Sequence, residues 1–217
     1  MDLAFPQMRK AQLIERENRF AVRALAGGEE IRLHLANSGR LRFLAPGTEL
    51  RYLPRPGPRT AGRVVLAKDR GAWVLLDSGY AERALPRLLP RLGYEFLSFQ
   101  PRFGPSRFDA LVLKEGAPVP LEMKSATHVE GGFACFPDAK SARARKHLRG
   151  LLEAGGVLVF AALNPHARAF RPCPFDPEFG EELELALEKG LRVHAVRAEV
   201  AEGGLRWAEE LSLYSKP

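Results

Sequence analysis

Hydrophobic and polar residues alternate with a period of two in the first third of the chain. Residues 31–35, for example, read Ile-Arg-Leu-His-Leu, a pattern typical of a strand with one buried face. Strand-like segments bounded by turn signals such as Gly27-Gly28 and Pro46-Gly47 are expected at 13–24, 31–35, 47–53, 62–68 and 72–76. Five short strands in so little chain predict a small closed barrel of the OB type.

Residues 54–63 interrupt this pattern with three prolines and three arginines. Proline cannot donate a hydrogen bond to a strand ladder, so this segment cannot be a central strand. We expect it to form a projecting basic loop.

After Gly79 the pattern changes to a mixture of strands and helices. Strands are expected at 108–114, 121–125, 157–163 and 191–196, with a turn at residues 116–120. Amphipathic helices are expected from 138 or 141 to 154 and at 177–189. Residues 81–92 are expected to form only short helical pieces, because Pro86 and Pro90 interrupt them. The order of elements predicts a mixed α/β fold: an OB-like barrel over residues 1–80 and an α/β domain with a mixed sheet over 81–217.

Composition excludes several classes of protein. The longest apolar run in the 217 residues is seven residues long, far too short for a membrane span, and the N-terminus carries no secretory signal pattern. We therefore expect a cytoplasmic protein that does not bind membranes. The spacing of the two cysteines, Cys135 and Cys173, indicates neither a disulfide framework nor a zinc site, and the five histidines lack zinc-binding spacing.

Positive charge is concentrated at the N-terminal end. The chain has 33 Lys and Arg against 26 Asp and Glu, and residues 1–80 hold 14 of the cations against 8 of the anions. This split is expected if the first domain meets a polyanion such as a nucleic acid. A basic but otherwise ordinary soluble surface would give the same count.

Asp109, Glu122 and Lys124 form the pattern with the clearest chemistry. Glu122 and Lys124 are two apart on one predicted strand and share a face, and a hairpin would bring Asp109 beside them. Two carboxylates can hold Mg²⁺ or Mn²⁺, and the lysine can orient water or neutralise charge during phosphodiester hydrolysis. The alternative is an exposed hairpin with a salt bridge, but both acids interrupt apolar runs, where unpaired charge is costly. The pattern resembles the motif of the PD-(D/E)XK nuclease superfamily, with Asp109, Glu122 and Lys124 as catalytic residues and the two acids as metal ligands.

The wider sequence resembles the sugar fermentation stimulation protein A family over essentially the whole chain. The matching segments are Leu33-His34-Leu35-Ala36-Asn37-Ser38-Gly39-Arg40, Ser106-Arg107-Phe108-Asp109, Leu121-Glu122-Met123-Lys124-Ser125, Phe136-Pro137-Asp138-Ala139, and Arg143 with Lys146-His147-Leu148. This resemblance implies an N-terminal OB-fold, a C-terminal nuclease-like fold and DNA binding without clear sequence preference. Gln100 stands where family members often have a Glu, a departure that could weaken metal binding.

A set of basic residues is predicted to contact nucleic acid. Its members are Arg32, Arg40, Arg42, Arg59, Arg63, Arg107, Arg143, Lys146 and His147, with Arg51 as a further candidate on the first domain. Phe20, Phe43, Tyr52 and Trp73 are candidates for stacking on bases, although for each ring taken singly the barrel core is the favoured interpretation. Asp138 is expected to cap the helix that follows it.

The leading hypothesis is therefore a DNA-binding protein, for double- or single-stranded DNA, with a metal-dependent nuclease site. The alternative is a non-catalytic DNA-binding regulator of sugar metabolism that keeps the nuclease fold. RNA as the substrate remains open.

Overall fold

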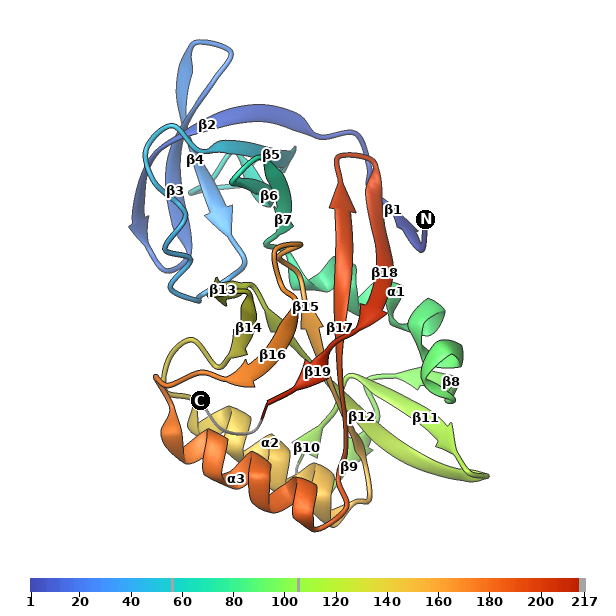
Figure 1. Cartoon of the computed structure of the whole chain (residues 1–217). Coiled ribbons are helices and arrows are strands. Elements are labelled where there is room, and N and C mark those ends of the chain that lie inside the picture. The colour runs from blue at the N-terminus through green and yellow to red at the C-terminus, as the bar shows by residue number, and fades with distance from the viewer. Residues whose placement is uncertain (56, 105, 215–217) are drawn as a thin grey trace.

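Six strands of the N-terminal part form one sheet that closes into a barrel in the computed structural model, which describes residues 1–55, 57–104 and 106–214 (Figure 1). They are β2 (Arg9–Asn18), β3 (Ala21–Ala26), β4 (Glu29–Leu35), β5 (Glu49–Pro54), β6 (Gly62–Asp69) and β7 (Ala72–Leu75). Their order is β4-β3-β2-β5-β6-β7, and an additional parallel pairing of β4 with β6 closes the five strands β2–β6. The predicted OB-type barrel is confirmed.

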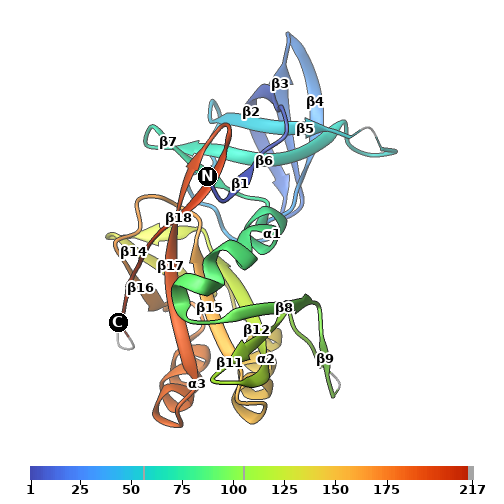
Figure 2. The same ribbon diagram turned by 90° about the vertical axis from the view of Figure 1, so that its right-hand side faces the viewer.

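The expected single strand at 13–24 is instead the hairpin β2–β3. The chain reverses after Asn18, whose side-chain oxygen accepts the backbone N–H of Phe20 at 2.8 Å. Asn readily makes such local bonds and so favours turns over a continuous strand. The predicted basic loop lies between β5 and β6 and extends away from the barrel (Figure 2), although Pro56 within it lies outside the described residues.

The C-terminal part is built on a seven-stranded mixed sheet, as predicted. Its order is β1-β18-β17-β15-β12-β11-β8, in which β12, β15 and β17 are parallel to one another. The strands are β1 (Leu3–Ala4), β8 (Glu95–Phe99), β11 (Ala110–Lys114), β12 (Ala117–Ala126), β15 (Val157–Ala162), β17 (Arg192–Ala201) and β18 (Gly204–Glu210). Because β1 pairs with β18, the first residues lie with this sheet and not with the barrel; a domain boundary near residue 80 stays a prediction.

The predicted turn at residues 116–120 is shorter than expected, since β12 begins at Ala117 and includes two prolines. Pro118 and Pro120 pair with β11, whereas β12 joins β15 only from Leu121 onward. The prolines therefore occupy the stretch where one side of the strand is not paired with β15, which is where a strand tolerates a missing N–H.

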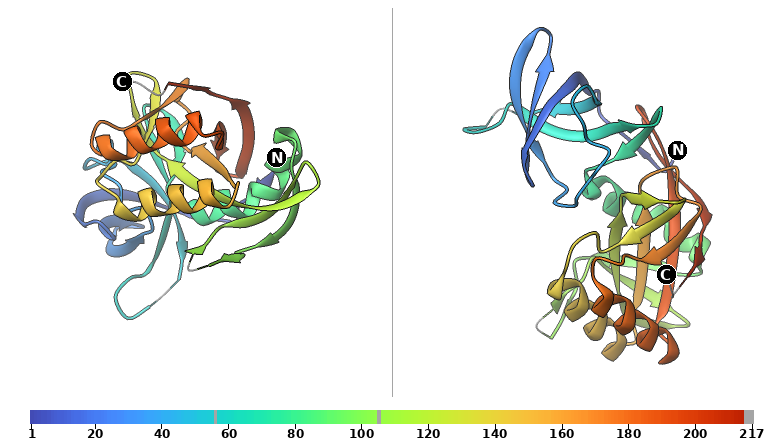
Figure 3. Two further views of the ribbon diagram at one scale, coloured as in Figure 1. Left: turned by 90° about the horizontal axis from the view of Figure 1, so that it is seen from below. Right: turned by 60° about the vertical axis from the view of Figure 1, so that its left-hand side comes forward.

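Helices cover both faces of the large sheet. α1 (Ser78–Leu88) and the short 3-10 helix η1 (Leu89–Leu92) lie on one face, and α2 (Ala142–Glu153) and α3 (Pro177–Glu188) lie side by side on the other (Figures 2 and 3). Successive side chains of β15 point alternately to the two faces of the sheet. Val159 packs in the hydrophobic cluster that contains the buried residues of α1, and Phe160 packs in the cluster that contains those of α2 and α3. The expectation of short helical pieces at 81–92 is wrong, because α1 continues through Pro86. The apolar face of α1 is buried, which outweighs the one lost hydrogen bond.

Two small sheets complete the fold. One pairs β9 (Arg102–Phe103) with β10 (Ser106–Arg107), and the other has the order β13-β14-β16-β19. The second sheet contains β13 (His128–Glu130), β14 (Phe133–Phe136), β16 (Ala169–Pro172) and β19 (Ser212–Leu213). Within the described part of the chain, none of the helices is both long and apolar enough to cross a membrane.

Candidate metal and nucleic-acid site

The β11–β12 hairpin brings Asp109 and Glu122 together. Ala110 pairs with Leu121 in the hairpin, so the preceding Asp109 lies opposite Glu122. Asp109 donates its backbone N–H to the carbonyl of Leu121 at 3.0 Å, and its Oδ2 accepts the backbone N–H of Met123 at 2.8 Å. Both bonds fix the carboxylate of Asp109 at the point where the two strands begin to pair.

Glu122 is buried, with 3% of its surface exposed, and its two oxygens have different surroundings. Oε1 accepts from Lys124 Nζ, two residues along the same strand, and lies 2.6 Å from Nδ1 of His147 on α2. Oε2 is buried and has no hydrogen-bond partner among the described residues. Leaving a buried carboxylate oxygen without a partner costs free energy. A cation bound to Oε2 would remove this cost, so this oxygen is a candidate metal ligand.

The electrostatics of the site raise the pKa of two acids. Burial, with the neighbouring Glu122 carboxylate, raises the pKa of Asp109 from 3.8 to about 7. Burial, and then the charges of Asp77 and Glu122, also raise the pKa of Glu82 on α1. The sequence interpretation missed Glu82, which the structure shows to line the cavity together with Ser78, one helical turn before it.

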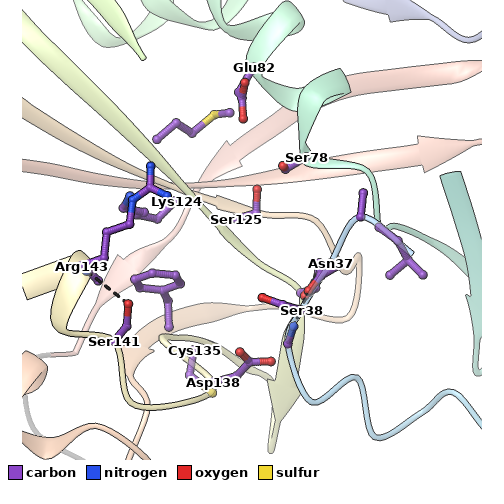
Figure 4. Close-up of a pocket in the computed structure, with 17 residues that line it drawn as sticks. Asn37, Ser38, Ser78, Glu82, Lys124, Ser125, Cys135, Asp138, Ser141 and Arg143 are labelled. Carbon is purple, nitrogen blue, oxygen red and sulfur yellow. Dashed lines mark hydrogen bonds between the residues drawn. The ribbon is translucent and has the colours of Figure 1, made fainter. Parts of the chain in front are cut away.

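A cavity of about 370 Å³ lies between the barrel and the C-terminal part (Figure 4). The loop after β4 contributes Asn37 and Ser38, and the C-terminal part contributes Glu82, Lys124 and Arg143. The candidate lysine therefore faces a space that both parts of the chain enclose.

The loop after β4 is fixed against the C-terminal part by Asp138. Oδ2 of Asp138 accepts the backbone N–H of Arg40 at 2.7 Å, and Asn37 donates its side-chain amide to Thr127 Oγ1 at 3.1 Å. A Cβ on residue 39 would lie 2.3 Å from Asp138 Oδ2, so only glycine permits this approach. The expectation that Asp138 caps α2 is wrong: Ser141 is the N-cap, and its Oγ accepts the N–H of Ala144.

The predicted nucleic-acid residues separate into exposed cations and side chains that are buried or held in ion pairs. The exposed ones are Arg40, Arg42, Arg59, Arg107, Arg143 and Lys146. Among the exposed cations, Arg107 donates to the side-chain oxygen of Gln100, and Arg40 packs on the ring of Phe175. Three residues are buried or held in ion pairs. Arg32 pairs with Glu17, and Arg63 pairs with Asp77. His147 is buried and contacts Glu122. Arg51 is also buried, and it pairs with Glu202 of the β17–β18 hairpin, so it joins the two parts of the molecule and does not present a charge to solvent.

Among the aromatic candidates, only Phe20 is largely exposed, at 56%. Tyr52 is buried in the barrel, and Phe43 and Trp73 pack against buried clusters. Phe20 lies at the tip of the β2–β3 hairpin. The guanidinium of Arg16, which donates to the carbonyls of Arg19 and Gly39, holds this tip beside the cavity loop.

The fold and the site together define a class of protein: an OB barrel joined to a mixed α/β part whose central hairpin carries two carboxylates and a lysine. The chain belongs to the sugar fermentation stimulation protein family. Residues 14–76 match the SfsA N-terminal OB domain, and residues 75–204 match the sugar fermentation stimulation protein RE domain.

Known relatives cover nearly the whole chain. The sugar fermentation stimulation protein homolog of Desulforamulus reducens is 33% identical over 215 residues, 93% of this chain and 90% of that protein. The homolog of Moorella thermoacetica is 36% identical over 208 residues, 88% of this chain and 90% of its own. The structure of Pyrococcus furiosus SfsA in complex with Ca²⁺ superposes with a TM-score of 0.88 at 25% identity, over 98% of both chains.

Proposed function

We propose that this protein is a metal-dependent nuclease of the PD-(D/E)XK type that binds DNA and hydrolyses its phosphodiester bonds. The observation that carries the proposal is the asymmetry of Glu122. One oxygen is held by Lys124 and His147, and the other is buried without a hydrogen-bond partner among the described residues. A carboxylate fixed in this way is organised to bind a cation.

The donor set fits Mg²⁺ or Mn²⁺. Asp109 and Glu122 Oε2 would hold the cation. Among the described residues, these two acids belong to no group of three His, Cys, Asp or Glu ligand atoms that all lie within 4.8 Å of one another. Mg²⁺ is commonly bound by only one or two carboxylates, with water and substrate phosphate as its other ligands. The Ca²⁺ in the Pyrococcus furiosus structure supports a hard cation in this family. When bound, such an ion polarises the phosphate and lowers the pKa of water.

The surrounding side chains have distinct roles. Lys124, half-buried and facing the cavity, neutralises charge that develops on the phosphate and orients the attacking water. His147 positions Glu122 through its Nδ1 contact. Glu82, whose pKa is raised by burial and by the charges of Asp77 and Glu122, stands at the cavity edge, where it can exchange a proton with water.

Nucleic-acid binding is supported by the charges and by one exposed ring. Arg143 lines the cavity, and the exposed Arg40 directly follows Gly39, which also lines it. We expect both arginines to contact backbone phosphates. Phe20 offers a stacking surface that any base can use. These features favour binding without strong sequence preference.

The experiment is cleavage of supercoiled plasmid, single-stranded DNA and RNA in Mg²⁺, Mn²⁺ or EDTA, with Asp109→Ala and Lys124→Ala as variants. Metal-dependent cleavage of DNA that both variants lose supports the proposal. Binding of DNA without cleavage in any metal would favour the regulator instead, and cleavage of RNA alone would change the substrate.

A further inference from the structure

Cys135, Cys173 and His128 come together in the small sheet, although their spacing in the sequence indicates no metal site. The two Sγ atoms lie 3.0 Å apart. A ring nitrogen of His128 and both sulfurs all lie within 4.8 Å of one another. In the part of the chain that the structure describes, this is the one group of three or more such ligand atoms at this separation.

The register of the sheet explains why the three side chains meet. His128 on β13 pairs directly with Cys135 on β14, so their side chains lie on the same face. Cys135 in turn pairs with Arg171 on β16, and Cys173 comes two residues later, which returns to that face. Two strands and the residue directly after a third, β16, therefore present one ligand each, a relation that only the strand pairing reveals.

The group is buried and incompletely satisfied. Both cysteines are 1% exposed and His128 is 8% exposed. Nε2 of His128 is buried without a hydrogen-bond partner among the described residues, an arrangement that costs free energy unless a ligand fills it.

We propose that Cys135, Cys173 and His128 form a second metal site, specific for a thiophilic divalent cation such as Zn²⁺ and separate from the acidic site. Two thiolates and an imidazole are ligands that select Zn²⁺ over Mg²⁺. Zn–S bonds of about 2.3 Å in tetrahedral geometry separate two sulfurs by about 3.8 Å, so the cysteines need to part by less than about 1 Å. Water completes the coordination, and the two thiols release their protons on binding.

This cation would stabilise the wall of the cavity that faces the barrel. Cys135 lines the cavity and lies three residues before Asp138, which holds the N–H of Arg40 (Figure 4). Phe175, two residues after Cys173, packs against the guanidinium of Arg40 at 3.9 Å. Both cysteines thus lead directly into segments that contact the barrel loop, so the site acts as a structural clip between the two parts.

The test uses Co²⁺ as a spectroscopic substitute for Zn²⁺ on full-length, reduced, metal-stripped protein under anaerobic conditions. We expect a thiolate-to-cobalt charge-transfer band that saturates at one equivalent and that Zn²⁺ abolishes by displacement. Cys135→Ala and Cys173→Ala should each remove the band, and His128→Gln should lower the Co²⁺ affinity at least tenfold. The matched control is Asp109→Asn with Glu122→Gln, which should keep the band because a carboxylate site cannot produce it.

Absence of the band in the reduced wild-type protein overturns the proposal, whatever the variants do. So does mass spectrometry that finds Cys135 and Cys173 joined in a disulfide together with no Co²⁺ binding after reduction. A band that the Asp109 and Glu122 variants abolish would also contradict it. Since the wild-type spectrum alone can refute the site, the result does not depend on any variant folding.

Discussion

The raised pKa of Asp109 predicts that Asp109→Asn stabilises the metal-free protein, and that the gain depends on pH. Asn has the same shape as Asp, and its side-chain oxygen can still accept the N–H of Met123 that Asp109 accepts at 2.8 Å. What the variant removes is the cost of ionising a carboxylate that burial and Glu122 hold at a pKa of about 7, up from 3.8.

The magnitude and sign follow from proton linkage. Below about pH 4 both folded and unfolded Asp109 carry the proton, and the variant gains nothing. As pH rises toward 7, Asp109 ionises in the unfolded chain but not in the folded one. The free energy of unfolding of the wild type therefore falls by up to about 1.4 kcal/mol per pH unit relative to the variant. Above about pH 7 the difference levels off. Because Asp109 is half-buried and partly screened by water, we expect a final gap of about 2–4 kcal/mol.

The assay is urea unfolding of wild type and Asp109→Asn in EDTA from about pH 5 to pH 9. The exposed Glu29→Gln on β4 serves as a control that should leave the free energy of unfolding almost unchanged at every pH. Adding Mn²⁺ should stabilise the wild type and not the variant, since the cation competes with the proton for Asp109. A gap that is constant with pH, or a variant that is less stable at about pH 8, would refute the assigned environment of Asp109.

Four further outcomes are expected. Glu122→Gln should abolish cleavage and leave DNA affinity equal or higher, because an anion near the phosphate is removed; parallel loss of folding, seen by circular dichroism, would point to a structural role. His147→Ala should weaken Mn²⁺ binding about tenfold or more, whereas His147→Gln, which keeps a donor for Glu122, should lose less; equal losses in a calorimetric titration would exclude the positioning role. Phe20→Ala should weaken binding of single-stranded DNA by about 1–3 kcal/mol, measured by fluorescence anisotropy. Phe99→Ala, which removes an exposed ring at the end of β8, should leave the affinity unchanged; equal effects of the two variants would refute the stacking role of Phe20. Arg143→Gln should reduce the log–log salt slope of DNA binding by about one, while Arg206→Gln on β18 leaves it unchanged; an unaltered slope for Arg143→Gln removes that residue from the interface.

The sequence predicted the fold well where periodicity was strong. The alternation at residues 31–35 and the apolar run at 157–163 became β4 and β15. The errors arose where local and tertiary preferences compete. Pro86 suggested a helix end, but burial of the apolar face of α1 keeps the helix continuous, and Pro118 and Pro120 are tolerated where β12 is not yet paired with β15.

The candidate site was predictable in part for a similar reason. Asp109, Glu122 and Lys124 lie on two strands joined by a short turn, so local spacing was enough to place them together. The long-range contacts were not accessible in this way. Glu82 reaches the cavity from a different element, and Cys173, which follows Cys135 by 38 positions, meets it only because β14 and β16 pair.

The central claim is that Asp109 and the unpartnered oxygen of Glu122 bind a divalent cation. Anomalous diffraction from crystals grown with Mn²⁺ tests it most directly. We expect a peak bonded to Asp109 and Glu122 Oε2 in the wild type, and no peak there in Glu122→Gln. Wild-type crystals saturated with Mn²⁺ that show no peak between these two carboxylates would contradict it.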